Sequence, residues 1–407
     1  MPAPRRVAVT GIGLMAALGL DRETVWDRMV EGHCGIDRVT LFDATGYRSQ
    51  RAAEIPGYAP DPDFSPKAWQ RLSRSDQIAI IATREALDDS GVLDSGVDRA
   101  EIALSMGSGT ADLMRNEDWF AEARQRGIRR ARPSKIFSHF PSNPSDVVAS
   151  HFHLGGPKVS VLSACSSGTV AIGYAADLVR SGQAQVAVAG ASDVLCRLTF
   201  SGFNALRLVD LEPCRPFCQT RKGMNLGEAG AMLVLEDLAA ARKRGARIYA
   251  EIAGYGVCCE AYHATAPEPE GHAIARLINE ALRASGVPAD SVDHVNAHGT
   301  ATLQNDQAEA RGMRQVFRDR TQRIPVTSVK SMIGHCLSAA GAIEAATLAL
   351  SIARGVIPPT VNYREPDPEC PLDVVANQAR EASISCGIST SLAFGGNDAA
   401  LVMRRIT

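Results

Sequence analysis

An internal repetition limits the folds that this chain can adopt. The segment REALDDSGV at residues 84–92 is matched by NEALRASGV at residues 279–287, 195 positions later. Each segment follows an amphipathic helical run, ends at a glycine of the kind that caps a helix, and leads into an apolar strand. A second pair follows in the same order: the segments that begin at residues 158 and 324 each indicate a buried strand, a tight turn and a helix.

The repetition predicts an α/β fold built from two related halves. The opening strands form a third pair, RRVAVTGIG from residue 5 and ARIYAEIAGYG from residue 246. Chance could match one pair of helix ends, but three pairs in the same order favour duplication. Strands that alternate with helices form parallel sheets covered by helices on both faces. We therefore expect one half at residues 1–245 and the other at residues 246–407.

The composition is that of an ordinary globular protein. With 407 residues, 45% of them hydrophobic, the chain can bury a large core. Its 43 basic and 45 acidic residues nearly cancel, which disfavours general nucleic-acid binding and leaves only local charged patches. The first strand is too short and too interrupted by glycine for a signal peptide, and no uninterrupted run of about 18 apolar residues indicates a membrane span. We expect a cytoplasmic protein that binds neither nucleic acid nor membrane.

One of the ten cysteines stands apart from the others. Most are scattered in a chain without a secretory signal, and we expect small buried residues rather than disulfides. Cys214 and Cys218 have neither a nearby histidine nor a second pair, which disfavours a zinc site. Cys165, in VLSACSSGTVAIG, stands where a strand ends and a helix begins, and the positive end of a helix favours the thiolate. It is either an activated nucleophile or a structural cysteine, and this segment alone does not decide.

Two histidines occupy similar places in the second half. His298 ends the strand of NAHGTAT, and His335 in SVKSMIGH follows Lys330 by five residues at the head of a helix rich in glycine and alanine. Two imidazoles close to a thiol suit a reaction that stabilises an enolate and moves a proton. A single histidine here would more simply be a cap or a core residue, and only the combination with Cys165 favours chemistry.

A glycine pair lies near the C-terminus, in SLAFGGNDAALVM. Glycines at Gly395 and Gly396 would let the backbone approach a ligand closely, so that its N–H groups could hold an oxyanion. Taken alone, the motif indicates no more than a turn.

The four motifs ACSSG, AHGTAT, KSMIGH and FGG, in this order, resemble the elongating β-ketoacyl-acyl-carrier-protein synthases of fatty acid and polyketide synthesis. The resemblance extends over essentially the whole chain. It implies a thiolase-like duplicated αβαβα five-layered sandwich. It also implies a dimer with active sites near the subunit interface, either a homodimer or a heterodimer with a ketosynthase-like subunit.

The resemblance also implies roles for individual residues. Cys165 would accept an acyl group from a carrier-protein thioester, with the amides of Cys165 and Phe394 as its oxyanion hole. His298 and His335 would bind the malonyl thioester and promote loss of carbon dioxide, and the enolate would attack the acyl group in a two-step, ping-pong reaction. The supporting charged network would comprise Lys330, Glu309 and Glu344. The residues expected to contact substrate are Thr300, Thr302, Thr110, Phe203, Leu392, Gly395 and Gly396.

Related classes fit the motifs less well. Initiating synthases pair the cysteine with His and Asn, and thiolases use a second cysteine near the C-terminus, whereas this chain has His335 and FGGND. Chain-length-factor subunits, which keep the fold without the nucleophile, are disfavoured by Cys165. A catalytic subunit that depends on such a partner stays open.

Several positions depart from the usual elongating enzyme and bear on substrate choice. Leu392 and Ala393 replace a Phe and a Gly in the loop before FGG, and Thr110 replaces an apolar residue at the floor of the acyl pocket. Cys218 stands where Asp is common, and FGGND replaces FGGTN. These changes favour a specialised polyene, polyketide or modified-lipid pathway over housekeeping fatty acid synthesis.

A basic stretch suggests a dock for the acidic carrier protein, because complementary charge speeds and orients association. The alternative is an ordinary solvated helix face. The candidate docking residues are Lys67, Arg71, Arg74, Arg124, Arg126, Arg129, Arg130 and Arg207. No organic cofactor is implied, since the carrier supplies its own phosphopantetheine. A monovalent cation near Asn296, Glu344 and Ser389 is left unassigned, because Thr390 departs from the pattern of relatives that bind one.

Overall fold

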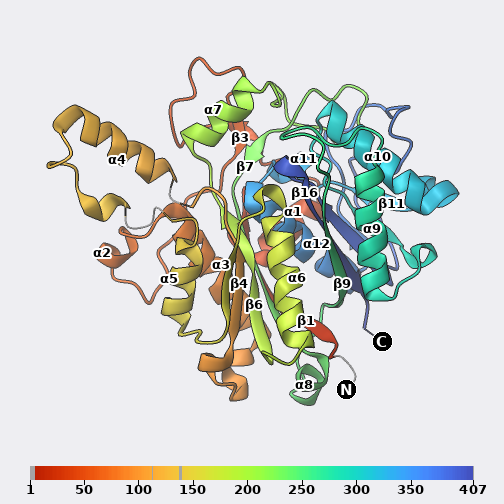
Figure 1. Ribbon diagram of the computed structural model, residues 1–407, viewed down its shortest axis with the longest axis horizontal. Helices are drawn as coiled ribbons and strands as arrows, with labels where there is room; N and C mark the ends of the chain where they lie inside the picture. Colours follow the sequence, from red (N-terminus) through yellow and green to blue (C-terminus); the bar gives the residue numbers. More distant parts are fainter. Residues whose placement is uncertain (1–4, 112, 137–139, 407) are drawn as a thin grey trace.

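The fold places two central helices between two layers of sheet. The computed structural model describes residues 5–111, 113–136 and 140–406. Helices α6 (Ser167–Arg180) and α12 (Ala340–Arg354) pack against each other in the middle, and strands flank them on either side (Figure 1). Helices α3 (Arg74–Ser90) and α5 (Asn143–Phe152) cover one outer face, and α9 (His272–Ser285) and α10 (Leu303–Phe317) cover the other. This is the predicted five-layered αβαβα sandwich.

The two strand layers are parts of one continuous sheet of eleven strands among the described residues. Strand β1 pairs antiparallel with β9, so the two opening strands of the repeated halves lie side by side at the junction. In spatial order the strands are β13 (Asp373–Val374), β11 (Pro325–Thr327), β10 (His294–Asn296), β15 (Cys386–Ser391), β16 (Asn397–Arg404), β9 (Ala250–Cys259), β1 (Val7–Ala16), β8 (Ala229–Asp237), β6 (Val186–Asp193), β4 (Ala103–Gly107) and β5 (Lys158–Val161).

Shorter elements complete the structure. In the described ranges, one small sheet contains β2 (Asp37–Arg38), β3 (Arg51–Ala53) and β7 (Leu226–Gly227), and another pairs β12 (Val356–Ile357) with β14 (Arg380–Glu381). The other α-helices in the part of the chain that the structure describes are α1 (Arg22–Val30), α2 (Pro66–Trp69), α4 (Leu113–Arg126), α7 (Arg197–Ala205), α8 (Leu238–Lys243) and α11 (Lys330–Ile333).

The repeated helix ends seen in the sequence have the same geometry. Helix α3 is capped by Gly91 at φ 60°, and α9 is capped by Gly286 at φ 66°. Each glycine N–H bonds back into the last turn of its helix, and this left-handed cap strongly favours a residue without a side chain. The repeated SGV motif is therefore a shared helix stop.

The central helix α12 is almost completely enclosed by protein. The segment Leu337–Arg354 is long and apolar enough to cross a membrane by composition, but 89% of it is buried inside this structure. Strands of both halves and α6 surround it. Its apolar character is therefore explained by its position in the core.

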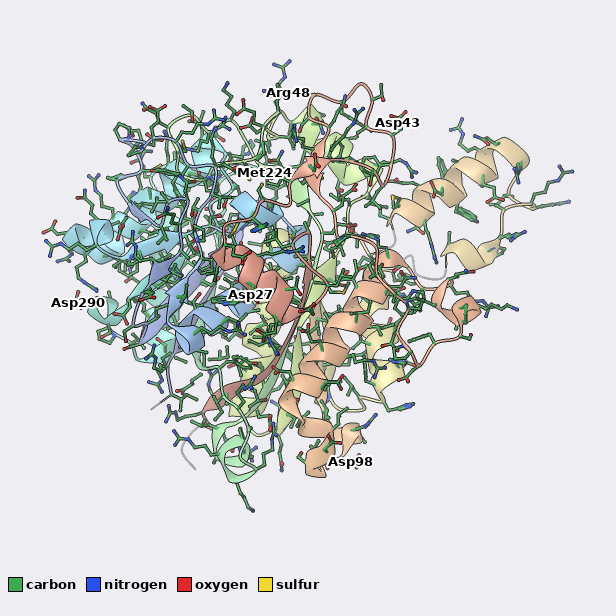
Figure 2. The ribbon with its side chains drawn as sticks, turned by 180° about the vertical axis from the view of Figure 1, so that it is seen from behind. Asp27, Asp43, Arg48, Asp98, Met224 and Asp290 are labelled. Atoms are coloured by element: carbon green, nitrogen blue, oxygen red, sulfur yellow. The ribbon has the colours of Figure 1, made fainter. Side chains whose placement is uncertain are left out.

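Helix α4 stands clear of the layered body. Figure 1 shows it at the far side from α9 and α10, and Figure 2 shows its side chains extending into solvent. None of its residues with a described side chain is buried, whereas α12 is almost wholly buried. This helix carries Arg124 and Arg126, two of the candidate docking residues.

Candidate active site

Cys165 lies in a tight turn between strand and helix. Strand β5 ends at Val161, a single 3₁₀ turn spans Ala164–Ser166, and α6 begins at Ser167. Ala164 adopts φ 52°, a left-handed conformation that costs free energy for a residue with a side chain. The turn holds the thiol at the N-terminus of α6 with 7% of the residue exposed. The cysteine is therefore placed as its sequence context predicted.

The two histidines come from separate turns of the second half. His298 follows β10, and His335 follows α11 and precedes α12. Their ring centroids are 5.3 Å apart and the ring planes are nearly perpendicular, at 86°. Because both residues are buried, this arrangement is held by the surrounding protein.

One pocket brings the cysteine and both histidines together. It contains about 590 Å³ of space between atoms and opens toward solvent. Its walls come from both halves of the chain and from loops far apart in sequence. The lining residues are Cys165, Phe203, Leu208, Met224, Glu260, His263, Thr265, Ala266, Pro267, His298, Thr300, Thr302, Gln304, Asn305, His335, Leu392, Ala393, Phe394, Gly395 and Asp398.

The hydrogen bonds of the histidines fix which ring nitrogen carries the proton. The Lys330 ammonium lies 3.2 Å from His298 Nδ1, and the Leu337 backbone N–H donates to His335 Nδ1 at 3.2 Å. Each Nδ1 is thus an acceptor, so each neutral ring carries its proton on Nε2. Burial, together with the Lys330 charge, lowers the pKa of both imidazoles well below the ordinary value. Both rings can therefore donate a hydrogen bond without being charged.

The Cys165 thiol is more strongly affected by burial than its sequence position suggested. Burial raises the pKa of Cys165 to about 12, while the Lys330 charge and the Phe394 backbone N–H act in the opposite direction. The positive end of α6 also favours the thiolate. The expectation of a lowered pKa from the helix N-terminus is therefore wrong, because desolvation outweighs the favourable charges.

A buried ion pair supports the histidine rings. The Lys330 ammonium pairs with the Glu344 carboxylate and donates to the His298 carbonyl at 2.6 Å. Burial raises the pKa of Glu344 to about 7, and Lys330 opposes that rise. The Glu309 carboxylate instead accepts the backbone N–H groups of His298 and Gly299, each at 2.8 Å. These three predicted residues therefore hold the His298 turn rather than line the pocket.

The family comparisons agree with this geometry. Residues 4–241 match the model described as "Beta-ketoacyl synthase, N-terminal domain", and residues 249–364 match "Beta-ketoacyl synthase, C-terminal domain". The chain belongs to the β-ketoacyl synthase family. It is an acyltransferase, a condensing enzyme of the ketosynthase type, and it has the thiolase-like fold of that family.

Individual relatives cover the synthase along its full length. The tetracenomycin polyketide synthase ketoacyl synthase alpha subunit of Streptomyces glaucescens is 38% identical over 99% of this chain and 98% of its own. The 3-oxoacyl-[acyl-carrier-protein] synthase 2 of Staphylococcus aureus strain N315 is 36% identical over 100% of this chain and 99% of its own. The solved structure of the ishigamide ketosynthase/chain length factor superposes with a TM-score of 0.93 at 34% identity, covering 100% of both chains.

Most of the predicted substrate contacts lie on the pocket wall of the synthase. Thr300, Thr302, Phe203, Leu392 and Gly395 all line it. The ring of Phe203 also stacks on that of Phe394, with centroids 5.5 Å apart. These residues therefore share the pocket of Cys165.

Two predicted contacts lie elsewhere. Thr110 and Gly396 are absent from the lining of this pocket in the described part of the chain. The Thr110 N–H donates to Asp193 at 3.0 Å, and its hydroxyl donates to the Val194 carbonyl at the same distance. Thr110 thus ties the end of β4 to the end of β6, a role that its sequence neighbours did not indicate.

The predicted docking residues differ in exposure. Lys67, Arg71, Arg207 and the arginines at 124, 126, 129 and 130 are exposed. Arg74 is not available as predicted, because its guanidinium bonds the buried Glu228 carboxylate at 2.7 and 2.9 Å. Arg115 of α4 donates to the backbone carbonyls of residues 70–72, which brings the two basic segments side by side.

Three buried oxygen atoms bear on the open question of a cation. Asn296 Oδ1, Glu344 Oε2 and Ser389 Oγ have no hydrogen-bond partner among the described residues. Asn296 is the direct neighbour of Ser389 across the β10–β15 pair, and its Nδ2 donates to the Glu344 carbonyl at 2.9 Å. Oxygen donors of this kind suit hard cations, so these residues fit a monovalent ion, which would supply positive charge beside Glu344.

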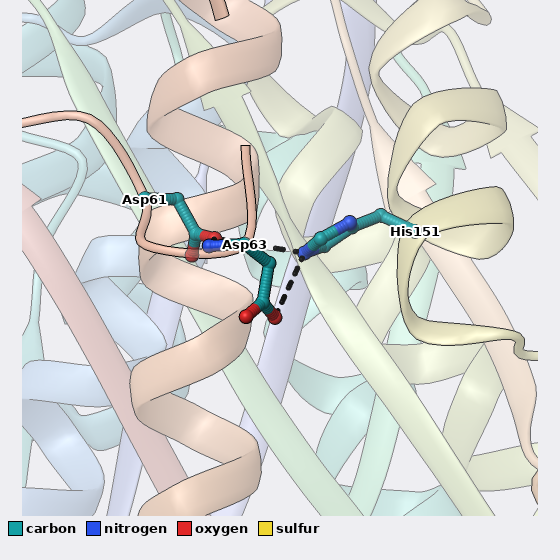
Figure 3. Close-up of side chains that lie close together, drawn as sticks. All are labelled: Asp61, Asp63 and His151. Carbon is teal, nitrogen blue, oxygen red and sulfur yellow. Dashed lines mark hydrogen bonds and ion pairs between the residues drawn. The ribbon is translucent and has the colours of Figure 1, made fainter. Parts of the chain in front are cut away.

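A separate cluster of Asp61, Asp63 and His151 has side chains that could bind a metal ion, but an arginine accounts for their arrangement. Figure 3 shows the two carboxylates and the imidazole facing one another. Arg84 pairs with both carboxylates, and its Nη2 lies 3.0 Å from His151 Nε2. A guanidinium thus supplies the positive charge that a metal ion would bring. The cluster fastens the loop before α2 to α3 and α5.

The sequence interpretation missed three ionisable residues on the pocket wall, namely Glu260, His263 and Asp398. Glu260 and His263 lie in the loop after β9, where no recognised motif marks them. Asp398 could have been found, because it is the acidic residue in FGGND where the usual motif ends in Asn.

Proposed function

We propose that Cys165 is the nucleophile of a β-ketoacyl-acyl-carrier-protein synthase, with His298 and His335 as the groups that stabilise the malonyl-derived enolate. The observation that carries this proposal is the single pocket that holds the thiol and two neutral imidazoles, each with a proton on Nε2. Lys330, Glu309 and Glu344 are positioning residues in this scheme.

The reaction proceeds in two steps. In the first, the Cys165 sulfur attacks the acyl thioester of the carrier protein, a new C–S bond forms, and the carrier thiol leaves with a proton. The backbone N–H groups of Cys165 and Phe394 stabilise the oxyanion. The favourable electrostatic effect of the Phe394 N–H on the sulfur supports this assignment.

In the second step, the two imidazoles donate hydrogen bonds from Nε2 to the thioester carbonyl of the malonyl unit. The C–CO₂ bond breaks, carbon dioxide leaves, and the electron pair forms an enolate whose oxygen is held by both rings. The enolate carbon attacks the acyl–Cys165 carbonyl, so that a C–C bond forms and the C–S bond breaks. The neutral charge of the rings suits this step, because a hydrogen bond strengthens as the oxygen becomes negative.

Partner, pathway and location belong to the same proposal. The acyl donor and malonyl donor are carrier-protein thioesters, and the carrier supplies the phosphopantetheine, so the enzyme needs no organic cofactor. We infer a second, ketosynthase-like subunit, a chain-length factor or another copy, with support from the relatives named above. Residues 1–245 and 246–407 form the two repeated halves, and the enzyme acts in the cytoplasm of a specialised polyene, polyketide or modified-lipid pathway.

Intact-mass analysis tests the nucleophile and the substrate class together. We expect the synthase, mixed with a panel of saturated, polyunsaturated and aryl acyl-carrier proteins, to gain the mass of one acyl group, and the Cys165→Ala variant to gain none. Preference for unsaturated or aryl groups would support the specialised pathway, whereas strong preference for plain saturated chains would contradict it. An adduct of equal yield on Cys165→Ala would show that another group is the nucleophile.

The exposed basic residues give a prediction about carrier docking. Replacing Arg71, Arg126 and Arg207 together with glutamine should raise the apparent KM for carrier-bound substrate by about tenfold at low salt, because long-range attraction to an acidic carrier is lost. Activity on a small thioester mimic should be unchanged. The matched control replaces Arg314, Arg318 and Arg323, which are exposed on and just after α10. Equal losses on both substrates would mean that the arginines are structural.

A further inference from the structure

Two acidic side chains on the pocket wall are brought together by a pair of neighbouring strands. Asp398 is the second residue of β16, and its register partner is Cys258 of β9. Glu260 comes directly after β9, and both acids line the pocket that contains Cys165. Asp398 is 2% exposed. The antiparallel pairing therefore brings the two carboxyl groups together, with Asp398 buried and Glu260 partly exposed.

One oxygen of each carboxyl group holds a loop of the pocket. Asp398 Oδ1 accepts the Ala393 backbone N–H at 3.0 Å, and Glu260 Oε2 accepts the Glu268 backbone N–H at 2.7 Å. Two further backbone hydrogen bonds join these loops, from Gly395 to the Ala264 carbonyl at 2.8 Å and from Glu260 to the Gly396 carbonyl at 3.0 Å. The loop that contains Phe394 is thus fastened to the loop after β9.

The other oxygen of each group has no donor. Asp398 Oδ2 and Glu260 Oε1 are both buried, and neither has a hydrogen-bond partner among the described residues. Two buried carboxylates with free oxygens repel each other, whereas a single shared proton gives both oxygens a partner. The pair therefore requires one proton to be stable in this arrangement.

The surroundings of Asp398 favour the protonated form. Burial, followed by the Glu260 charge, raises the pKa of Asp398 to about 8, and Glu309 of α10 acts in the same direction. From β9, Cys258 faces the carboxyl group, and its own pKa is raised by burial and by Asp398. His263 also lines the pocket wall, and the Arg276 guanidinium of α9 donates to the Cys259 carbonyl at 2.9 Å.

We propose that Asp398 is a positioning residue that works in its protonated form, donating to Glu260 while its other oxygen accepts the Ala393 N–H and so holds the next residue, Phe394, with its peptide N–H toward Cys165. This inference rests on the proposed function, because that peptide N–H is the assigned oxyanion donor. The usual FGGTN motif has Asn at this position, and an amide can accept from Ala393 and donate to Glu260 without taking up a proton. Asp398 reproduces that pattern only while it is protonated.

The sign of the pH dependence follows from the raised pKa. The hydrogen bond is present below pH 8 and is lost as the pH rises through about 8. Deprotonation leaves two like charges in contact, which moves the Phe394 loop away from its productive position. Acylation of Cys165 should therefore lose its oxyanion donor at alkaline pH in the wild-type enzyme but not in Asp398→Asn.

The test measures the rate of Cys165 acylation between pH 6 and 9.5. A short acyl N-acetylcysteamine thioester is the acyl donor, and intact mass reports the adduct. The ratio of wild-type rate to Asp398→Asn rate should be constant below pH 7 and should be about tenfold lower at pH 9 than on this plateau, as one proton is lost. Glu260→Gln should behave like Asp398→Asn, because its amide can donate to an ionised Asp398, and it serves as a second test if Asp398→Asn does not fold.

A constant ratio across the whole range, for both variants, would overturn the inference. Failure of the wild type and both variants to form any Cys165 adduct at any pH, with this thioester and with the panel of acyl-carrier proteins, would instead overturn the proposed function. The two failures are therefore distinguishable.

Discussion

Replacing His335 with alanine is expected to lower the rate of condensation by about 10²- to 10⁴-fold while leaving acylation of Cys165 nearly unchanged. The reason is that the two steps use different groups. Acyl transfer depends on the thiol and the backbone N–H groups of the oxyanion hole, whereas decarboxylation depends on the two imidazole donors. Steady-state condensation with malonyl-carrier protein measures the first effect, and intact mass after a single acylation measures the second.

His263 provides the matched control, because it lines the same pocket but accepts the N–H groups of Thr265 and Ala266 in its own loop. We expect His263→Ala to change the condensation rate by less than about tenfold, since no role in the chemistry is assigned to it. If His335→Ala abolished acylation as well as condensation, the division of labour between the two steps would be wrong. Equal effects of both variants on condensation would contradict the role of the imidazole pair.

Replacing Lys330 with methionine is expected to destabilise the synthase by about 3–5 kcal/mol, because it leaves Glu344 buried without its partner charge. Both side chains are almost completely enclosed, at 2% and 1% exposure. Without Lys330, the already raised pKa of Glu344 rises further. The loss of stability should therefore be larger at pH 8 than at pH 6, where Glu344 can be neutral. Denaturant unfolding at the two pH values measures this difference.

The double variant Lys330→Met, Glu344→Gln is the control for stability. It removes the unpaired charge and should recover part of the lost free energy of unfolding at pH 8, while condensation stays impaired because His298 lacks its Nδ1 partner. If Lys330→Met alone lost the same free energy of unfolding at pH 6 and at pH 8, the assigned ion pair would be contradicted.

The layered fold could be predicted because each repeated element is encoded by a short, continuous segment of sequence. Helix stops such as Gly91 and Gly286 and the strand-turn-helix segments around Cys165 and His335 are each encoded within about 30 residues. The positions of the three candidate catalytic residues follow, because all of them occupy the turns that connect a strand or a short helix to the next helix. The motifs therefore identified the parts of the pocket that belong to these turns.

The remaining features depend on contacts between distant segments. Arg74 was predicted to be a docking residue, but in the folded chain its guanidinium pairs with Glu228, which is distant in sequence. Thr110 bonds Asp193 because β4 and β6 are parallel neighbours. The raised pKa of Cys165 likewise comes from burial by many loops, which no single segment encodes.

The pairing of Asp398 with Glu260 is the clearest example, since it requires β16 to lie antiparallel to β9. Nothing in either segment shows that the two acids meet. In the sequence, only the departure from the usual FGGTN motif distinguishes Asp398, and the pairing of β16 with β9 determines its partner.

A crystal structure of the acyl-enzyme would examine the claim on which the remaining proposals depend, that one sulfur atom faces two neutral rings within a shared cavity. We predict electron density for the acyl group on Cys165, its carbonyl oxygen within hydrogen-bond distance of the Cys165 and Phe394 amides, and Nε2 of both His298 and His335 directed at the space beside it. Acyl density on another cysteine, or a Cys165 side chain turned away from both rings, would contradict the account.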